Sequence, residues 1–241
     1  MSDHDFSLVL QRFEATQTLF GRCLLHLHVH QQRLRAGWHV NGSAVLKRAF
    51  DVVVSFILLI LLSPLFAVIA LLVKLEDGGP VFFAQTRVGQ FGQEYKMYKI
   101  RSMCLDAEQR LKDLLAKNQH QEGVTFKLKD DPRITRAGKW LRKFSCDELP
   151  QLYNVLIGDM SLVGPRPPVP REVAKYSLAQ RRRLAIRPGI TCIWQISGRS
   201  EIDFSGQVKL DVDYIETQSF WVDLKILTKT VPAVISGRGA C

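Results

Sequence analysis

The feature that most constrains this chain is an uncharged apolar run from Val52 to Val73. At ~1.5 Å per residue, a straight helix over this run would reach about 33 Å, which matches a hydrocarbon core of about 30 Å. The run begins too far from the N-terminus for an ordinary cleavable signal peptide, and charged residues border it on both sides. It therefore predicts a segment that enters a membrane.

Ser63 and Pro64 interrupt the apolar run. A proline inside a helix removes a backbone hydrogen bond and clashes with the preceding turn, which costs about 3 kcal/mol unless the helix bends. Each arm beside the bend is about half as long as the hydrocarbon core is thick. Ser63 can donate a hydrogen bond to a carbonyl that the bend releases. A re-entrant helix, a kinked spanning helix and burial in a soluble core all stay open on these residues alone.

The charge balance calls for an anionic partner. Lys and Arg number 33 against 23 Asp and Glu, which gives a net charge of +10 and a pI near 9.6. Nucleic acid, an anionic membrane surface and a phosphorylated small molecule all fit this charge. A hydrophobic content of 46% excludes a fully disordered chain. The five cysteines form no C-x-x-C pair, so we expect reduced thiols facing the cytoplasm.

Downstream of the run, the pattern predicts short elements separated by turns. Two strands are expected around the turn at 90–93, and apolar positions at helical spacing predict an amphipathic helix over 104–119. The further helices expected lie at 139–143, 147–156 and 171–187. These elements predict an α+β fold that is mostly helical.

The stretch from Ser145 to Glu148 supports two interpretations. Taken alone, Ser145 with Glu148 three residues later favours a capping box at the start of a helix. The adjacent carboxylates of Asp147 and Glu148 also suit phosphoryl transfer, in which one carboxylate attacks phosphorus and the other holds a divalent cation. Arg142 and Arg166 could supply guanidinium forks for phosphate. Arg166 lies between prolines, which limit the freedom lost on binding but also suit a rigid surface turn.

Six groups of motifs occur in order along residues 44–241. They are K-R-A-F-D before the run with its Ser-Pro pair, R-V-G at 87–89, K-I-R-S-M at 99–103, D-P-R-I-T at 131–135, the stretch 141–167, and R-P-G-I-T with W-Q-I-S-G-R within 187–199. Together they closely resemble the bacterial sugar transferases, the monotopic polyprenyl-phosphate phosphoglycosyl transferases that start exopolysaccharide, capsule and O-antigen synthesis. Many separated motifs in order are far more specific than one short pattern.

The resemblance implies a two-step exchange. Asp147 would attack the β-phosphorus of a UDP-sugar, forming a phosphosugar-aspartate and releasing UMP, and undecaprenyl phosphate would then take the sugar phosphate. Glu148 would be the expected Mg²⁺ ligand, together with Asp147, and Arg142 and Arg166 would lie near the phosphates. The donor favoured is UDP-glucose or UDP-galactose. No nucleic-acid partner is expected, and the oligomeric state stays open, a homodimer included.

The resemblance also implies how the chain meets the membrane. We expect an N-terminal extension at 1–43, a re-entrant helix at 44–76 with its bend at Ser63 and Pro64, and a catalytic domain at 77–241. The catalytic domain would lie on the cytoplasmic face of the inner membrane, in contact with lipid. The membrane would be entered from one face only.

Several residues keep two interpretations. Arg187, Trp194 and Arg199 could shape the nucleotide or sugar pocket or could close the fold. Cys146 stands where the family usually has an aliphatic residue, so it is either a small packed residue or a thiol whose pKa is lowered at a helix N-terminus. Two other functions stay open: a membrane-tethered basic binding module, and a glycosyltransferase that moves the sugar alone and releases UDP.

Overall fold

The computed structural model describes residues 42–107, 109–110, 131–198 and 202–237. The expected extension at 1–43 and the expected helix at 104–119 therefore lie mostly outside the described residues, as does Arg199. The chain divides into two units, Met1–Arg48 and Ala49–Cys241, and apart from residues 42–48 of the first helix the features below belong to the second.

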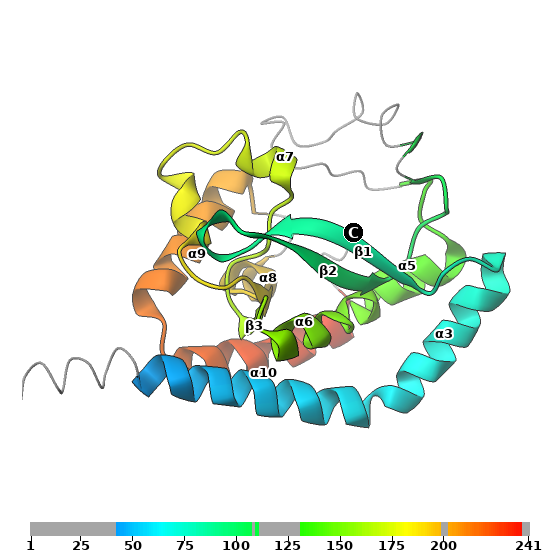
Figure 1. The fold of residues 1–241 in the computed structure, drawn as a ribbon, viewed down its shortest axis with the longest axis horizontal. Coiled ribbons are helices and arrows are strands. Elements are labelled where there is room, and N and C mark those ends of the chain that lie inside the picture. The colour runs from blue at the N-terminus through cyan, green and yellow to red at the C-terminus, as the bar shows by residue number, and fades with distance from the viewer. Residues whose placement is uncertain (1–41, 108, 111–130, 199–201, 238–241) are drawn as a thin grey trace, which may run out of the picture. The chain divides into compact units, whose positions relative to one another are not determined.

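The apolar run forms two helices with a bend between them. The helix Gly42–Leu61 is followed by α3, Ser63–Asp77, at an angle of 59° (Figure 1). Pro64 lies in the first turn of α3, where its missing N–H has no helical partner to lose, and the Ser63 hydroxyl donates to the Ile60 carbonyl at 2.8 Å. Among the described residues no single helix is long and apolar enough to cross a membrane. The two helices of this bent pair reach the necessary length and apolar composition only when they are taken together.

The first sheet is a hairpin. Strands β1 (Phe82–Val88) and β2 (Glu94–Ile100) pair antiparallel, from Phe82 opposite Ile100 to Val88 opposite Glu94. A 3-10 turn at Gln90–Gly92 joins them. The two strands predicted around this turn are confirmed.

The second sheet was not predicted. Strands β3 (Ser161–Val163) and β4 (Gly189–Thr191) pair in parallel, and each has only three residues. Their ends approach so closely that a Cβ on Gly189 would lie 2.0 Å from the Gly164 nitrogen. Glycine is required at this crossing because any side chain would collide with backbone.

Helices make up most of the described chain, which confirms the mostly helical α+β class. They are α5 (Arg136–Lys143), α6 (Gln151–Ile157), α7 (Pro170–Val173), α8 (Ile193–Ser197), α9 (Phe204–Thr217) and α10 (Phe220–Ser236), with 3-10 turns at Cys146–Glu148 and Gln180–Leu184. The helix predicted over 147–156 is confirmed from Gln151 onward, but its start is wrong, because the chain makes a 3-10 turn first and α6 begins only after Pro150. The helix predicted over 171–187 is also wrong, since two short pieces replace it.

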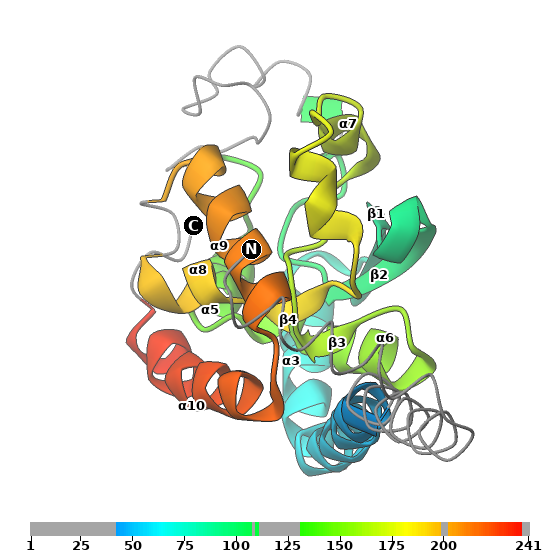
Figure 2. The same ribbon diagram turned by 90° about the vertical axis from the view of Figure 1, so that its left-hand side faces the viewer.

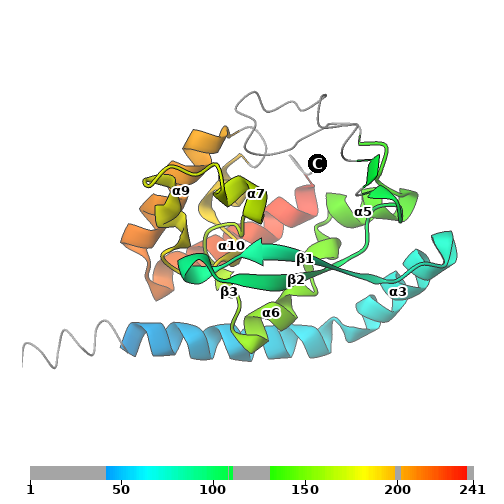
Figure 3. The same cartoon turned by 45° about the horizontal axis from the view of Figure 1, so that its top comes forward.

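Two apolar clusters hold these elements together. The larger one joins β2, α6, β3, α9 and α10, and its central residues are Met97, Val155, Met160, Val163 and Tyr214. Figure 2 shows α8–α10 on one side of the short parallel sheet and the hairpin on the other, while α6 packs under the hairpin (Figure 3). The smaller cluster, Ile69, Val73, Ile100 and Leu141, joins α3 to β2 and α5.

Candidate active site

Two adjacent acids lie on the 3-10 turn between α5 and α6. Ser145, which precedes this turn, has φ 53°, a left-handed conformation that is costly for a residue with a side chain. The turn closes through the backbone, because the Glu148 N–H donates to the Ser145 carbonyl at 3.1 Å. The Ser145 side chain makes no capping hydrogen bond. The capping-box interpretation is therefore wrong, and the strained backbone sets the direction of Asp147 and Glu148.

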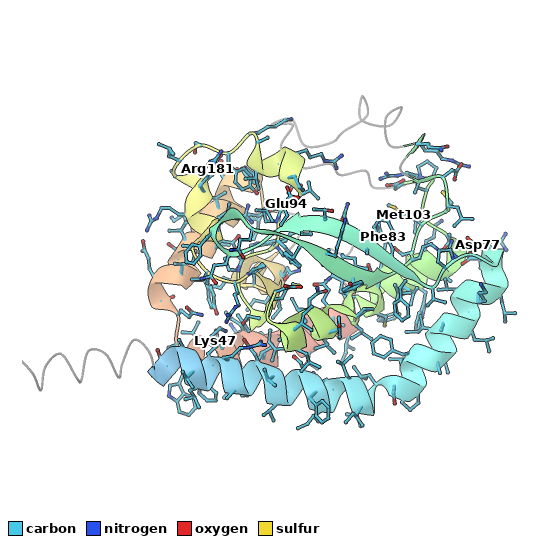
Figure 4. The ribbon with its side chains drawn as sticks, viewed as in Figure 1. Lys47, Asp77, Phe83, Glu94, Met103 and Arg181 are labelled. Atoms are coloured by element: carbon cyan, nitrogen blue, oxygen red, sulfur yellow. The ribbon has the colours of Figure 1, made fainter. Side chains whose placement is uncertain are left out.

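A lysine from the hairpin pairs with the second acid. Lys99 Nζ lies 2.7 Å from Glu148 Oε1. Lys99 stands opposite Phe83 in the hairpin register, and Figure 4 labels Phe83 on β1. Both partners are partly buried, so water screens the pair less than it would an exposed one.

The two acids have opposite electrostatic settings. Asp147 is only 7% exposed, and this burial raises the pKa of its carboxyl, although Lys99 and Arg142 partly oppose the rise. Burial also raises the pKa of Glu148, but there the charges of Lys99 and Arg166 outweigh it, and the net pKa is lowered. Neighbouring carboxylates whose pKa values are driven apart can take different chemical roles.

Arg142 is aimed by the packing of α5. Thr135 caps this helix, its hydroxyl accepting from the Gly138 N–H at 3.0 Å. Gly138 lies against the Ser102 carbonyl, where a Cβ would come within 2.0 Å of the oxygen. The helix can therefore approach closely enough for Arg142 Nε to donate to Ser102 Oγ at 3.1 Å.

Arg166 projects from a loop whose backbone is held on both sides. The flanking prolines are buried while Arg166 is exposed. The Pro165 carbonyl accepts from the Gly189 N–H at 2.9 Å, and the Pro167 carbonyl accepts from Arg87 Nη1 at 3.0 Å. Because both neighbours of Arg166 are fixed, little backbone freedom is lost when its guanidinium binds an anion.

Trp194 and Arg87 complete the surroundings of Arg166. The Arg166 guanidinium carbon lies 5.9 Å from the centre of the Trp194 ring, within the range of a cation–π contact. Arg87 is buried, and its burial together with the nearby charge of Arg166 lowers its pKa to about 10. Arg87 is still charged near neutral pH, so two guanidinium groups converge here.

A pocket opens beside Glu148. Its lining includes Arg87, Lys99, Gln151 and Arg166. Three cations around one carboxylate make a site for a ligand with several anionic oxygens, such as a phosphate or diphosphate.

The structure brings most of the sequence-predicted site residues together and leaves one of them apart. Asp147, Glu148, Arg142 and Arg166 are brought into one electrostatic neighbourhood, since the pKa of each acid responds to at least one of the arginines. Trp194 is buried and meets this group through Arg166. Arg187 is exposed and is not among the residues that line the pocket.

Sequence reasoning assigned no role to Lys99, Arg87 or Gln151. Lys99 and Arg87 belong to the K-I-R-S-M and R-V-G motifs, and each lies on a strand of the hairpin. Their limited exposure marks them, since Lys and Arg are rarely buried without a partner, and this exposure is visible only in the structure. Gln151 gives no such signal, because a glutamine at the start of a helix is ordinary.

The acidic pair can be tested for its fit to Mg²⁺. Within the described residues, no three or more His, Cys, Asp or Glu side chains come together as a metal cage. Mg²⁺ in phosphoryl-transfer sites is commonly held by one or two carboxylates together with substrate phosphates. Lys99 engages Oε1 of Glu148, and no described residue engages Oε2. The pair Asp147 and Glu148 therefore fits a cation that the substrate helps to bind.

Cys146 is a packed residue. Burial and the charge of Asp147 raise the pKa of its thiol, and Sγ faces the Phe144 carbonyl at 3.8 Å. The alternative of a lowered thiol pKa is wrong, because the neighbouring carboxylate opposes a second negative charge. Cys146 packs on the smaller apolar cluster, and Cys104, Cys146 and Cys192 all carry free thiols.

The end of α3 is tied to the site. Asp77, labelled in Figure 4, forms a two-pronged ion pair with Arg101, which follows β2 directly. Glu76 Oε1 accepts from the Arg136 N–H at 2.8 Å at the start of α5. The apolar helix is thus joined both to the strand that carries Lys99 and to the helix that carries Arg142.

Comparisons with known proteins give these features a context. The family model described as bacterial sugar transferase matches residues 42–237. The galactosyl transferase CpsE of Streptococcus agalactiae is 58% identical over 68% of this chain, which spans 37% of that protein's length. The undecaprenyl-phosphate galactose phosphotransferase of Salmonella typhimurium is 44% identical over 83% of this chain and 42% of its own length. The exopolysaccharide production protein ExoY of Rhizobium meliloti is 44% identical over 83% of this chain, which spans 89% of ExoY. With a family model that covers most of its length and relatives this similar, the chain belongs to the bacterial sugar transferases.

Proposed function

We propose that this chain transfers a hexose-1-phosphate from a UDP-hexose to undecaprenyl phosphate and releases UMP. The donor is UDP-glucose or UDP-galactose, and the reaction is the first membrane step of exopolysaccharide or related glycoconjugate synthesis. The observation that carries the proposal is the acidic turn, with Asp147 buried and its neighbour Glu148 held by Lys99. The names of the relatives, which include a galactose phosphotransferase acting on undecaprenyl phosphate, support the same chemistry.

In the first step, a carboxylate oxygen of Asp147 attacks the β-phosphorus of the donor. The bond from this phosphorus to the bridging oxygen breaks, and its electron pair leaves on the phosphate of UMP. Arg142 and Arg166 offset the charge that builds on the phosphoryl oxygens, where fixed cations are most effective. Burial supports the role of Asp147 because a poorly solvated carboxylate is a stronger nucleophile once it is ionised.

In the second step, an oxygen of undecaprenyl phosphate attacks the same phosphorus. The bond between phosphorus and Asp147 breaks, which restores the carboxylate and yields undecaprenyl-diphospho-hexose. The bond between the sugar carbon and its oxygen is intact throughout, so the anomeric configuration is retained. Covalent storage on Asp147 lets a soluble donor and a lipid acceptor use one site in turn.

Glu148, with Asp147 beside it, would hold Mg²⁺. When bound, the cation supplies Lewis-acid shielding of the phosphate oxygens. The carboxylate oxygen of Glu148 that Lys99 does not engage supports this assignment.

The bent helix pair is the proposed membrane anchor. It enters the inner membrane from the cytoplasmic face and leaves by the same face, so the catalytic domain contacts lipid headgroups. Large apolar side chains exposed along both arms support this: Val53, Phe56, Ile57, Ile60, Leu61, Val68, Leu71, Leu72 and Leu75. In water such a surface would be unfavourable, whereas acyl chains would cover it.

Nucleotide release tests the proposal. The full chain in detergent is incubated with Mg²⁺, undecaprenyl phosphate and a panel of UDP-hexoses, and UMP and UDP are measured separately. Release of UMP with one hexose is the expected result and names the donor. Release of UDP would assign the chain to glycosyl transfer instead.

A further inference from the structure

Two buried carboxamides on α6 have very different surroundings. Asn154 is satisfied by the chain itself, since its Oδ1 accepts from the Tyr98 N–H at 3.0 Å and its Nδ2 donates to the Lys96 carbonyl at 2.7 Å and to Asp159 at 3.1 Å. Gln151 is almost equally buried, at 3% exposed. Within the part of the chain that the structure describes, its side chain has no hydrogen-bond partner.

The Gln151 amide is unpaired but still accessible: the fully buried, unpartnered side-chain atoms of the described residues include Trp194 Nε1 and Arg87 Nε, but neither amide atom of Gln151. Another buried glutamine, Gln207, donates from Nε2 to the Ile202 carbonyl at 3.0 Å. Polar groups that are cut off from water are nearly always paired, so an amide without a partner in the chain is one that reaches the space of the pocket. An unpaired amide that is kept beside a functional site is therefore a candidate for contact with a ligand.

Gln151 lies where a ligand of the reaction would be. It lines the same pocket as Lys99, Glu148 and Arg166. It is also the first residue of α6, which starts directly after the acidic turn and Pro150. A ligand whose phosphate meets Lys99 and Arg166 therefore brings the atoms next to that phosphate toward Gln151.

The chemistry of the pocket separates the roles of these groups. Phosphate oxygens need donors only, and Arg87, Lys99 and Arg166 provide them. A carboxamide both donates and accepts, which matches a sugar hydroxyl because a hydroxyl also does both. We infer that the Gln151 carboxamide hydrogen-bonds a hydroxyl of the donor hexose and takes part in selecting the sugar. This inference rests on the proposed function and deepens it.

Deoxy analogues of the donor provide a direct test. A site built to hydrogen-bond a hydroxyl rejects the analogue that lacks it, because the buried partner is left unpaired. The full chain in detergent is assayed for UMP release with its preferred UDP-hexose and with the corresponding UDP-deoxyhexoses, one hydroxyl removed at a time. The variant is Gln151→Met, which keeps the length of the side chain and removes the amide.

The expected result is a loss of discrimination at one position. The unsubstituted protein should use one deoxy analogue about 10- to 100-fold less well than the parent sugar, measured as kcat/KM. Gln151→Met should use the parent sugar less well by a similar factor and should no longer distinguish it from that analogue. If Gln151→Met lowers kcat/KM for every analogue equally and keeps the discrimination, the inference is overturned while the proposed function stands. If the unsubstituted protein releases no UMP from any donor, both are overturned.

Thermal unfolding gives a readout that does not depend on activity. Because Gln151 has no partner within the described chain, Gln151→Met should leave the Tm unchanged or raise it. Asn154→Leu, the matched change on the same helix, should lower the Tm, since it breaks three hydrogen bonds. An equal drop in Tm for the two variants would mean that the Gln151 amide is structural, and would overturn the inference.

Discussion

At the scale of single residues, the site depends on two neighbouring carboxylates that the fold treats differently. Asp147 is nearly buried, whereas Glu148 is paired with Lys99. A turn with only a structural role would need neither this difference between the two acids nor the costly left-handed backbone of Ser145. The contrast supports the proposed roles, with the nucleophile on the less solvated acid and the cation on the acid whose charge is stabilised.

Exchange of each acid for its amide tests these roles. Asp147→Asn should lower turnover by at least about 1,000-fold, because an amide oxygen does not form the covalent intermediate. Glu148→Gln should lower the apparent affinity for Mg²⁺ about 10- to 100-fold without unfolding the domain. Both are measured by UMP release across a Mg²⁺ titration, with circular dichroism as the folding control. Normal turnover by Asp147→Asn, with deamidation excluded by mass spectrometry, would refute the assignment of the nucleophile.

The pH dependence follows from the raised pKa of Asp147. In the proposed step the carboxyl must be ionised to attack, so kcat/KM should fall as the pH drops through this raised pKa. Lys99 lowers the pKa of both acids, so Lys99→Met should move the acid limb of the profile to higher pH. Lys96→Met, on the same strand and exposed, should leave it in place. An acid limb that stays fixed or moves to lower pH in Lys99→Met would contradict this account.

At the scale of elements, the Arg166 loop is held between the hairpin and the short parallel sheet. The Val88 N–H of β1 donates to the Pro168 carbonyl at 2.9 Å, and the Gly164 N–H donates to the Thr191 carbonyl of β4 at 3.0 Å. The loop therefore depends on the crossing of Gly164 and Gly189. A shift of this crossing should therefore displace Arg166 more than it displaces the more distant helices.

A single methyl group added at Gly189 tests whether the Arg166 loop depends on this crossing. Gly189→Ala should destabilise the protein by about 1–3 kcal/mol, because its Cβ would lie 2.0 Å from a backbone nitrogen that cannot move freely. Gly198→Ala is the control, since its nearest contact would be the flexible side chain of Ile202 at 3.3 Å. The comparison uses thermal unfolding and kcat/KM. Equal unfolding temperatures for the two variants would show that the crossing tolerates a side chain.

How much of this could be predicted differs from one element to the next. The hairpin and the bend at Pro64 are local features, so turn residues and one proline predicted them. Strands β3 and β4 were missed because three residues carry no period and their pairing is not local. The helix expected over 147–156 was predicted to start too early, because Pro150 and the strained Ser145 favour a turn before α6.

The site shows the same division. The resemblance to the family pointed to the acids and to two arginines, whereas the partner of Glu148 stayed hidden because Lys99 lies 49 residues away along the chain. Gln151 was missed for another reason. Its signal is the absence of a partner, and only the packed structure reveals that.

At the scale of the whole molecule, the proposed function needs a basic chain that is partly embedded in a bilayer. A net charge of +10 favours an anionic surface and phosphorylated substrates. The ion pair of Asp77 with Arg101 and the contact of Glu76 with α5 join the apolar helix to the site. The lipid substrate and the soluble donor would therefore meet at one place.

Labelling of introduced cysteines tests the re-entrant arrangement. Cysteines placed at Ser43 and Pro80, before and after the bent pair, should both be protected from a membrane-impermeant maleimide in intact spheroplasts. Both should react once the membrane is opened. Labelling is compared with that of the parent chain, so that native thiols are subtracted. If only one cysteine reacts in intact spheroplasts, the pair crosses the membrane, and if both react, the pair is entered from the opposite face; either result contradicts the proposed arrangement.

Intact-mass spectrometry shows whether a covalent phosphosugar forms on Asp147. The purified chain is incubated with Mg²⁺ and its preferred UDP-hexose without the lipid acceptor. We predict a mass increase of one phosphohexosyl group on the unsubstituted protein, release of UMP in step with it, and neither for Asp147→Asn. Undecaprenyl phosphate added afterwards should remove the adduct. If UMP is released only when the lipid is present and no adduct forms at any time, transfer is direct and the account is contradicted.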